Sequence, residues 1–238
     1  MIILAGGVAT RLHPLTEKVP KALLEVGGQP FIIQQLKLLR SRGFREVVIS
    51  AWYKGEMIQS ILGSGEKFDI ELKFVFDGER PLGTGGAIRR AMKAVQGPFF
   101  VLYGDSYLPC DYAGVQSDFM RSDQPGLMTV FKNDGNWDAS NVELKNGRII
   151  SYDKQHRSPR MNYIDYGLGL FQPGAFAFLP DGQSADLEAV YQKLLGEGDL
   201  LAYEVKERFY EIGSFEGLQE LDALLRRSPE QFLQKAEG

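Results

Sequence analysis

Residues 1–21 read MIILAGGVATRLHPLTEKVPK. The apolar beginning of this stretch predicts a short buried strand, which leads directly into Gly6 and Gly7. Adjacent glycines allow backbone N–H groups to approach an anion closely. Arg11 and Lys21 add two cations to the same loop. Because ligands of an open parallel sheet bind beyond the carboxyl ends of its strands, the stretch predicts a polyphosphate-binding loop.

Short apolar runs alternate with helical patterns through the first half of the chain. Strands are expected at residues 46–50, 72–76 and 99–103, and helices at residues 31–42, 55–62 and 86–95. Strands separated by helices of this size predict βαβ units. Right-handed crossovers then place helices on both faces of the sheet. The pattern predicts an α/β protein with three layers, αβα, around a mostly parallel central sheet.

The pattern changes after Asp105. Strands are expected at residues 127–132, 141–144, 148–152, 164–171 and 209–212, and helices at residues 111–121, 187–195 and, after an N-cap at Ser214, up to residue 226. The Asn146-Gly147 pair between two strand-like runs is a strong hairpin signal. We therefore expect a small antiparallel lobe within one domain that spans residues 1–238.

The composition is that of a globular protein and excludes several classes. The chain carries 27 Lys and Arg against 31 Asp and Glu, a net charge of −4, which argues against a general nucleic-acid binder or a binder of anionic membranes. No apolar run approaches the roughly 20 residues of a transmembrane helix. One cysteine, Cys110, allows neither an internal disulfide framework nor a cysteine zinc cluster. We expect a cytoplasmic protein.

Two common glycine motifs do not fit the first loop. The dinucleotide-binding fingerprint needs G-x-G-x-x-G and an acid at the end of the second strand, but that strand ends Ser50-Ala51-Trp52. The P-loop motif G-x-x-x-x-G-K-[ST] is also absent from the sequence.

The first loop instead resembles the signature of the sugar-1-phosphate nucleotidylyltransferases. The matching segments are Leu4-Ala5-Gly6-Gly7, Thr10-Arg11-Leu12, Pro14-Leu15-Thr16 and Pro20-Lys21. The chain departs at Ala9, where the family usually has glycine. Later matches are residues 81–87, 103–105, 151–154 and 209–214, so the resemblance covers the chain to about residue 225. It implies a Rossmann-like fold of GT-A type, without a C-terminal β-helix domain.

The resemblance also implies a reaction and a set of site residues. A nucleoside triphosphate and a sugar 1-phosphate would give a nucleotide-sugar and pyrophosphate, with Mg²⁺ as cofactor. Residues 1–105 would mainly bind the nucleotide and residues 106–226 mainly the sugar phosphate. The implied catalytic residues are Arg11, Lys21 and Asp105. The implied nucleotide-binding residues are Leu4, Ala5, Gly6, Gly7, Thr10, Arg11, Gly85 and Gly86. The implied sugar-phosphate residues are Asn141, Lys154, Asp165 and Gly167, and the implied metal ligands are Asp105 and Glu211.

Two of these positions depart from the family pattern. Glu211 stands where the family has aspartate, so a metal would sit differently or bind through water. Asp165 stands where many relatives have the asparagine of Asn-Ala-Gly.

The second glycine loop indicates the substrates. Residues 82–87, LGTGGA, look most like heptose-1-phosphate guanylyltransferases and muramate-1-phosphate uridylyltransferases. Muramate enzymes commonly have glutamate where Gly83 stands, so we favour GTP with a heptose or mannose-like 1-phosphate. A uridylyltransferase acting on a hexosamine or muramate 1-phosphate is the alternative. Dimers are common in the family, so a homodimer is possible.

Two other functions compete with this one. A glycosyltransferase of GT-A type would be expected to carry a D-x-D metal motif, and Asp105-Ser106-Tyr107 supplies only the first acid. A non-catalytic sensor of sugar nucleotides would be favoured by the loss of Lys21 or Asp105, but both are present.

Overall fold

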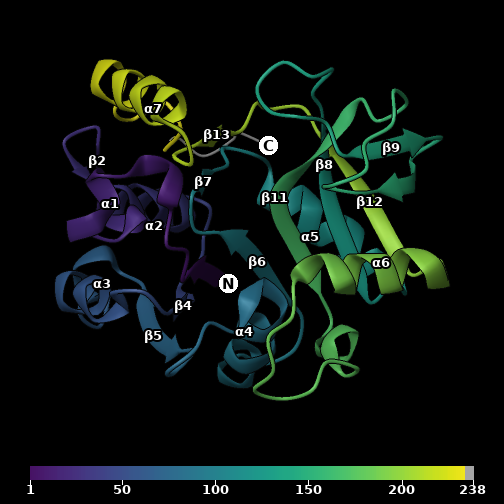
Figure 1. Ribbon diagram of the computed structural model, residues 1–238, viewed down its shortest axis with the longest axis horizontal. Helices are drawn as coiled ribbons and strands as arrows, with labels where there is room; N and C mark the ends of the chain where they lie inside the picture. The colour runs from purple at the N-terminus through teal and green to yellow at the C-terminus, as the bar shows by residue number, and fades with distance from the viewer. Residues whose placement is uncertain (234–238) are drawn as a thin grey trace.

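The computed structural model describes residues 1–233, and a nine-stranded sheet runs through it (Figure 1). The order along its main path is β10 (Arg148–Tyr152), β9 (Val142–Lys145), β11 (Tyr163–Phe171), β6 (Phe99–Tyr103), β1 (Ile2–Ala5), β4 (Glu46–Ala51) and β5 (Glu71–Phe76). Off this path, β8 (Gly126–Lys132) pairs with β11 and with β12 (Leu200–Val205). The neighbours β6, β1, β4 and β5 are parallel, whereas β11 is antiparallel to β6.

Helices cover both faces of this sheet. One core cluster packs it against α2 (Phe31–Ser41), α3 (Gly55–Leu62) and α5 (Tyr112–Arg121). The other packs it against α4 (Gly83–Ala91) and α6 (Leu187–Glu197). The predicted three-layer α/β fold with an antiparallel lobe is therefore confirmed.

A third apolar cluster joins the outer side of α2 to the C-terminal helix. There α2 packs on α7 (Phe215–Arg227) and on the hairpin of β2 (Glu25–Val26) and β3 (Gln29–Pro30). The predicted N-cap at Ser214 is confirmed, because its side chain accepts the Gly217 N–H at 3.0 Å. This cap fixes the start of α7 next to the end of β13 (Tyr210–Glu211).

The predicted hairpin between β9 and β10 is also present. Asn146 and Gly147 both have positive φ, +52° and +73°, as a tight two-residue turn between twisted strands requires.

The structure differs from one predicted helix in its bounds and contains elements that were not expected. The helix expected at residues 86–95 begins at Gly83 and ends at Ala91, followed by a 3₁₀ turn at Met92–Ala94, so the second glycine loop forms the first turn of α4. Strand β12 and the β2–β3 hairpin were not expected. Five of the six residues of β12 are half-buried, so the strand shows no alternation of buried and exposed positions.

The fold brings several loops to one edge of the sheet. The carboxyl ends of β1, β4, β5 and β6 lie at this edge because these strands are parallel. Just beyond it, β7 (Ser106–Tyr107) pairs with β13, which sets Glu211 opposite Ser106. Among residues 1–233 no helix has the length and apolar character to cross a membrane.

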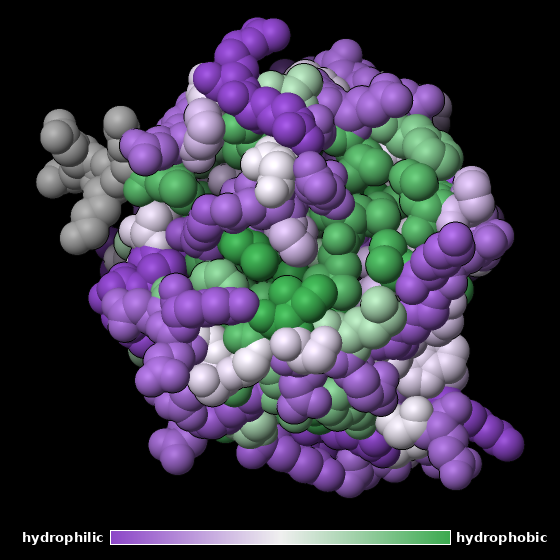
Figure 2. All heavy atoms as spheres, turned by 90° about the vertical axis from the view of Figure 1, so that its left-hand side faces the viewer, coloured by the Kyte–Doolittle hydropathy of each residue, from purple (hydrophilic) through white to green (hydrophobic). Residues whose placement is uncertain are grey.

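Apolar side chains are also exposed on the outer surface beside α1 (Leu15–Lys18) and α3. Figure 2 shows the left-hand side of Figure 1, where hydrophobic residues gather in the middle of a hydrophilic surround. Leu15 of α1 and both Met57 and Ile61 of α3 are exposed.

Candidate active site

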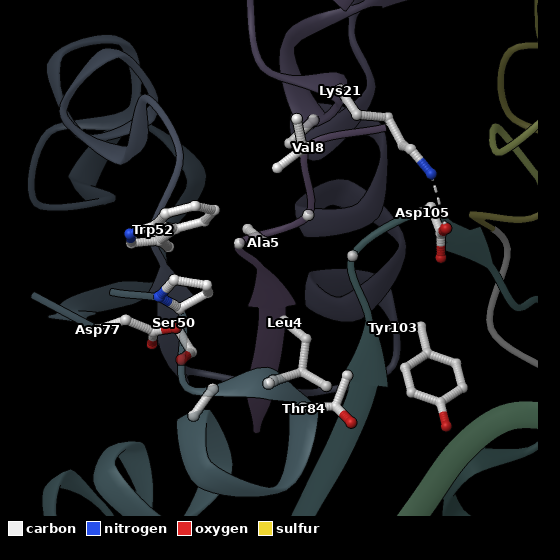
Figure 3. A pocket seen from close by; sticks show the side chains of 17 residues that line it. Leu4, Ala5, Val8, Lys21, Ser50, Trp52, Asp77, Thr84, Tyr103 and Asp105 are labelled. Carbon is white, nitrogen blue, oxygen red and sulfur yellow. Dashed lines mark hydrogen bonds and ion pairs between the residues drawn. The ribbon is translucent and has the colours of Figure 1, made fainter. Parts of the chain in front are cut away.

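A cleft of about 500 Å³ lies at the carboxyl ends of the parallel strands. Its lining residues come from the first loop, the second glycine loop and the strand ends: Leu4, Ala5, Gly6, Gly7, Val8, Lys21, Ala22, Ser50, Trp52, Asp77, Pro81, Gly83, Thr84, Ala87, Tyr103, Gly104 and Asp105. In Figure 3, Lys21 and Asp105 lie on one side of the β1 end, and Ser50, Trp52 and Asp77 lie on the other. We call the side with Lys21 and Asp105 the charged end of the cleft, because a cation and an anion meet there. The side with Ser50, Trp52 and Asp77 is its opposite end.

The first loop presents backbone to the cleft. Gly7 is exposed, and a Cβ added to it would meet no atom within 4 Å, so open space faces this glycine. Ala9 has φ of +54°, in the left-handed region, and the Thr16 hydroxyl donates to the Ala9 carbonyl at 2.9 Å. This conformation explains why a glycine is the easier residue at position 9.

Thr10 and Arg11 lie just outside the cleft wall. They belong to the 3₁₀ turn at Thr10–Leu12, and both are exposed. Arg11 has no ion pair among the described residues and does not line the cleft. Its predicted contact with a triphosphate stays a prediction.

Lys21 and Asp105 meet directly. The Lys21 Nζ lies 2.9 Å from Asp105 Oδ2, and the two side chains are 17% and 39% exposed. Lys21 opens the 3₁₀ turn at Lys21–Leu23, and Asp105 follows β6. The fold thus pairs the one lysine and the one aspartate that the sequence singles out as catalytic.

Glu211 lies next to this pair. A Cβ built on Gly213 would stand 2.6 Å from Glu211 Oε2, 3.6 Å from Lys21 Nζ and 3.7 Å from Asp105 Oδ2. The Ile212 N–H donates to the Asp105 carbonyl at 2.9 Å, which ties the two acidic segments together. The Glu211 carboxylate already accepts the Gly213 N–H and, at 2.6 Å, the Ser214 hydroxyl.

The two carboxylates suit a metal that is shared with a ligand. Mg²⁺ is commonly held by one or two carboxylates, several waters and phosphate oxygens. Within the described residues no group of three or more Asp, Glu, His or Cys side chains forms a candidate metal site. The two carboxylates of Asp105 and Glu211 therefore fit a divalent metal ion.

The predicted sugar-phosphate residues converge on Asp165. Its Oδ1 accepts the Gly167 N–H at 3.0 Å, and its backbone N–H donates to Asn141 Oδ1 at 2.9 Å. Its Oδ2 accepts the hydroxyls of Tyr103 and Tyr152, each at 3.2 Å. Burial raises the pKa of the Asp165 carboxyl, while Lys154 and these hydrogen bonds oppose the rise.

Lys154 lies over the same two tyrosines. Its Nζ is 5.6 Å from the centre of the Tyr103 ring and 5.8 Å from that of Tyr152. Tyr103 also lines the cleft, so it links this cluster to the charged end. Sequence reasoning missed both tyrosines, although each stands at a strand end.

Gly85 and Gly86, which the resemblance implies as nucleotide-binding residues, have a reason within the fold to be glycines. Their predicted contact with the nucleotide stays a prediction. In the structure, a Cβ on Gly85 would lie 2.8 Å from the Asp186 carbonyl oxygen, and one on Gly86 would lie 2.4 Å from that of Gln183. Gly83 and Thr84 line the cleft instead.

The opposite end of the cleft holds Ser50 and Asp77. Ser50 Oγ is buried and has no hydrogen-bond partner within residues 1–233. Asp77 is 7% exposed and accepts the Leu82 N–H at 2.9 Å through Oδ2. Burial raises the pKa of its carboxyl. Asp77 was not among the predicted site residues, although it directly follows β5. Ligands of an open parallel sheet bind beyond such strand ends, so its position was a signal that could have identified it.

The chain belongs to the nucleotidyl transferase family, whose model matches residues 1–228. It is 28% identical over 206 residues to a mannose-1-phosphate guanylyltransferase of Mycobacterium tuberculosis, covering 85% of this chain and 57% of the relative. It is 36% identical over 110 residues to a D-glycero-alpha-D-manno-heptose 1-phosphate guanylyltransferase of Campylobacter jejuni, covering 46% of this chain and 49% of the relative. The chain thus spans about half the length of these two relatives.

The fold is shared with solved structures. The inositol-1-phosphate CTP transferase of T. maritima superposes with a TM-score of 0.78 at 22% identity, covering 97% of this chain and 95% of that one. At this identity the likeness concerns the fold.

Proposed function

We propose that this protein transfers a nucleoside monophosphate from a nucleoside triphosphate to a sugar 1-phosphate, releasing pyrophosphate. The observation that carries the proposal is the arrangement of one cleft. A backbone loop and the Lys21–Asp105–Glu211 group occupy its charged end. Family membership over residues 1–228 supports the same reaction class.

The chemistry needs positioning and charge neutralisation. The attacking oxygen belongs to an ionised phosphate, so no side chain has to remove a proton from it. The phosphates carry negative charge in the transition state, and a cation held in a fixed position stabilises this charge. The attraction between cation and phosphate is strong where water is excluded from the site. Lys21 is that cation, and the open face of Gly7 lets the phosphates approach the backbone of the first loop.

Asp105 and Glu211 would hold the magnesium ion. When bound, Mg²⁺ would contact phosphate oxygens and offset their charge. The Lys21 ammonium has three donors and Asp105 has a second oxygen, so each can take phosphate or metal as a further partner beside their ion pair. Because Mg²⁺ would bind both the carboxylates and the phosphates, we expect nucleotide and metal to bind together.

Asp77 favours guanine as the base. Guanine presents two adjacent N–H donors on one edge, and an ionised carboxylate is purely an acceptor. Asp77 Oδ1 and Ser50 Oγ lie at this end and have no partner among the described hydrogen bonds. Uracil offers one such donor between two carbonyl oxygens, which a carboxylate would repel.

The sugar subsite is the cluster around Lys154 and Asp165, reached through Tyr103. The two named relatives are guanylyltransferases for mannose 1-phosphate and a manno-heptose 1-phosphate. We propose a sugar 1-phosphate of this class as the substrate. We also propose that the reaction takes place in the cytoplasm, because free nucleoside triphosphates are found there. The oligomeric state stays a prediction.

A pyrophosphate-release assay tests the proposal. The protein is mixed with Mg²⁺, one of GTP, UTP, CTP or dTTP, and mannose 1-phosphate, a manno-heptose 1-phosphate or N-acetylmuramate 1-phosphate. Release that is fastest with GTP and a manno-configured sugar is the expected result. Faster release with UTP and the muramate substrate would favour the uridylyl alternative.

A further inference from the structure

A buried glutamine of α2 holds both ends of the turn that carries Asp105. The Gln35 side chain is 1% exposed, and its Nε2 donates to the Ser106 carbonyl at 2.7 Å and to the Tyr103 carbonyl at 3.2 Å. Tyr103 ends β6 and Ser106 begins β7. Only Gly104 and Asp105 lie between these two residues. One NH₂ group thus joins the two flanks of the turn across 68 and 71 positions of sequence.

The chemistry of the amide matches this position. The NH₂ group of Gln35 supplies two N–H donors, one for each carbonyl, and turning the amide over would place its oxygen against both carbonyl oxygens. The other end of the amide, Gln35 Oε1, is buried and has no hydrogen-bond partner within residues 1–233. A buried acceptor without a partner costs stability. The two donated bonds therefore account for an amide here, and its oxygen does not.

The backbone of the turn is also held by β1 and by the segment after β13. The Gly104 N–H donates to the Leu4 carbonyl at 3.0 Å, and a Cβ on Gly104 would overlap that carbonyl oxygen. The Ile212 N–H donates to the Asp105 carbonyl at 2.9 Å. The Asp105 side chain is 39% exposed and bonds to Lys21. Because this side chain is only partly enclosed, its place depends on the backbone that carries it.

Helix α2 also contacts the turn that carries Lys21. Ala22 of that turn belongs to the same core cluster as Leu36 of α2. Both members of the ion pair are thereby set against one helix, Lys21 through apolar packing and Asp105 through the amide of Gln35. Figure 3 shows the resulting ion pair at the charged end of the cleft.

We propose that Gln35 is a positioning residue that sets the Asp105 carboxylate against Lys21 and the metal. The proposal rests on the proposed function, because it takes Asp105 as a metal ligand. Gln35 does not line the cleft, so it acts through the backbone of the turn. Loss of its NH₂ group loosens the turn and weakens metal binding.

Gln35→Met is the first test variant, because methionine is an unbranched side chain without an N–H donor. Gln35→Glu is the second, because glutamate keeps the length of glutamine and can donate to one of the two carbonyls at most. Gln34→Met is the matched control. Gln34 also lies on α2, is 8% exposed, and donates through Nε2 to the Val26 carbonyl of β2 at 2.9 Å. The control thus loses a buried hydrogen bond that does not reach the turn of Asp105.

Amide hydrogen exchange followed by NMR is the first readout, and it needs neither substrate nor metal. The Ile212 N–H reports on the Asp105 carbonyl, and the Gly104 N–H reports on the contact of the turn with β1. Relative to the amides of β4, both should exchange about tenfold faster in Gln35→Met and less so in Gln35→Glu. In Gln34→Met both should exchange as in wild type. Unchanged relative exchange of both amides in Gln35→Met would overturn the proposal.

The metal dependence of the rate is the second readout. The Mg²⁺ concentration for half-maximal pyrophosphate release should rise roughly tenfold in Gln35→Met, as when the partner of a metal ligand is removed. At saturating Mg²⁺ the KM for GTP should stay at its wild-type value. Equal Mg²⁺ dependence in Gln35→Met and Gln34→Met would overturn the role of Gln35 towards the metal. If wild-type protein shows no turnover with any substrate pair, the proposed function fails, and the exchange rates still decide whether Gln35 positions Asp105.

Discussion

The ammonium of Lys21 and the carboxylate of Asp105 form a 2.9 Å ion pair across 84 positions of sequence. Both groups have another partner in the proposed reaction, phosphate for the lysine and metal for the aspartate. The ion pair keeps the two charges compensated while the cleft holds no ligand, since isolated, partly buried charges are costly.

The variant Lys21→Ala tests separately the contact of Lys21 with phosphate and its pairing with Asp105. In Lys21→Ala we expect kcat to fall about 10²–10³-fold, as when one preorganised donor is removed. We also expect Mn²⁺ to bind more tightly without nucleotide, because Asp105 loses its internal partner. Pyrophosphate release measures the first effect and Mn²⁺ electron paramagnetic resonance the second. Lys18→Ala, an exposed lysine of α1, is the control. Wild-type turnover in Lys21→Ala would contradict its role.

Two glycines with different surroundings should respond differently to alanine. Gly86→Ala puts a Cβ 2.4 Å from the Gln183 carbonyl oxygen, and such overpacking costs about 1–3 kcal/mol. Gly7→Ala meets no atom within 4 Å, so we expect a change within about 0.5 kcal/mol but weaker GTP binding. Thermal unfolding with and without GTP measures both. A destabilised Gly7→Ala that binds GTP normally would reverse the assignment.

We expect the Asp77 carboxylate to serve base recognition and at the same time to lower the stability of the folded protein. Because burial raises the pKa of Asp77, its ionised form is unfavourable in the folded state. The folded protein then holds more protons than the unfolded one, so this contribution to stability falls as pH rises through the raised pKa. Asp77→Asn keeps an oxygen for the Leu82 N–H. Its stability relative to wild type should therefore be higher at about pH 7 than at about pH 4.5.

The same variant tests base selection. Asp77→Asn should lower the preference for GTP over ITP, which lacks the exocyclic amino group. Thermal shifts with the two nucleotides give this preference. An unchanged ratio of GTP to ITP affinity would remove Asp77 from base recognition.

We expect Glu211 to affect how the rate depends on the Mg²⁺ concentration. Glu211→Gln keeps the side-chain length but loses the charge, so the Mg²⁺ concentration for half-maximal rate should rise at least about tenfold. Glu216→Gln is the control, an exposed acid of the first turn of α7. A Mg²⁺ titration of the rate compares the two, and equal curves would exclude Glu211 as a ligand.

The sequence predicted those parts of the fold whose signals are local. Apolar runs and glycine stops located the strands beside β1, and Asn146-Gly147 located the hairpin. Strand β12 was missed because its half-buried residues show no alternation, and its pairing with β8 depends on residues about 75 positions away.

The residues of the site, too, could be predicted from the sequence only where their signals are local. The first loop, Lys21 and Asp105 could be predicted from strand ends and a long ordered motif. The reason for Gly85 and Gly86 could not, because the segment at residues 183–186 that fills their space lies about 100 positions away. The contacts of Tyr103 and Tyr152 with Asp165 likewise appear only when β6, β10 and β11 assemble.

The proposed transfer reaction takes place at the cleft that holds Lys21 and Asp105. The most direct test is pyrophosphate release from GTP, a manno-configured sugar 1-phosphate and Mg²⁺, with each component omitted in turn. We expect release that needs all three components and is lost in Lys21→Ala. No release above the protein-free rate, with any pairing of the four nucleoside triphosphates and the sugar 1-phosphates, would contradict it.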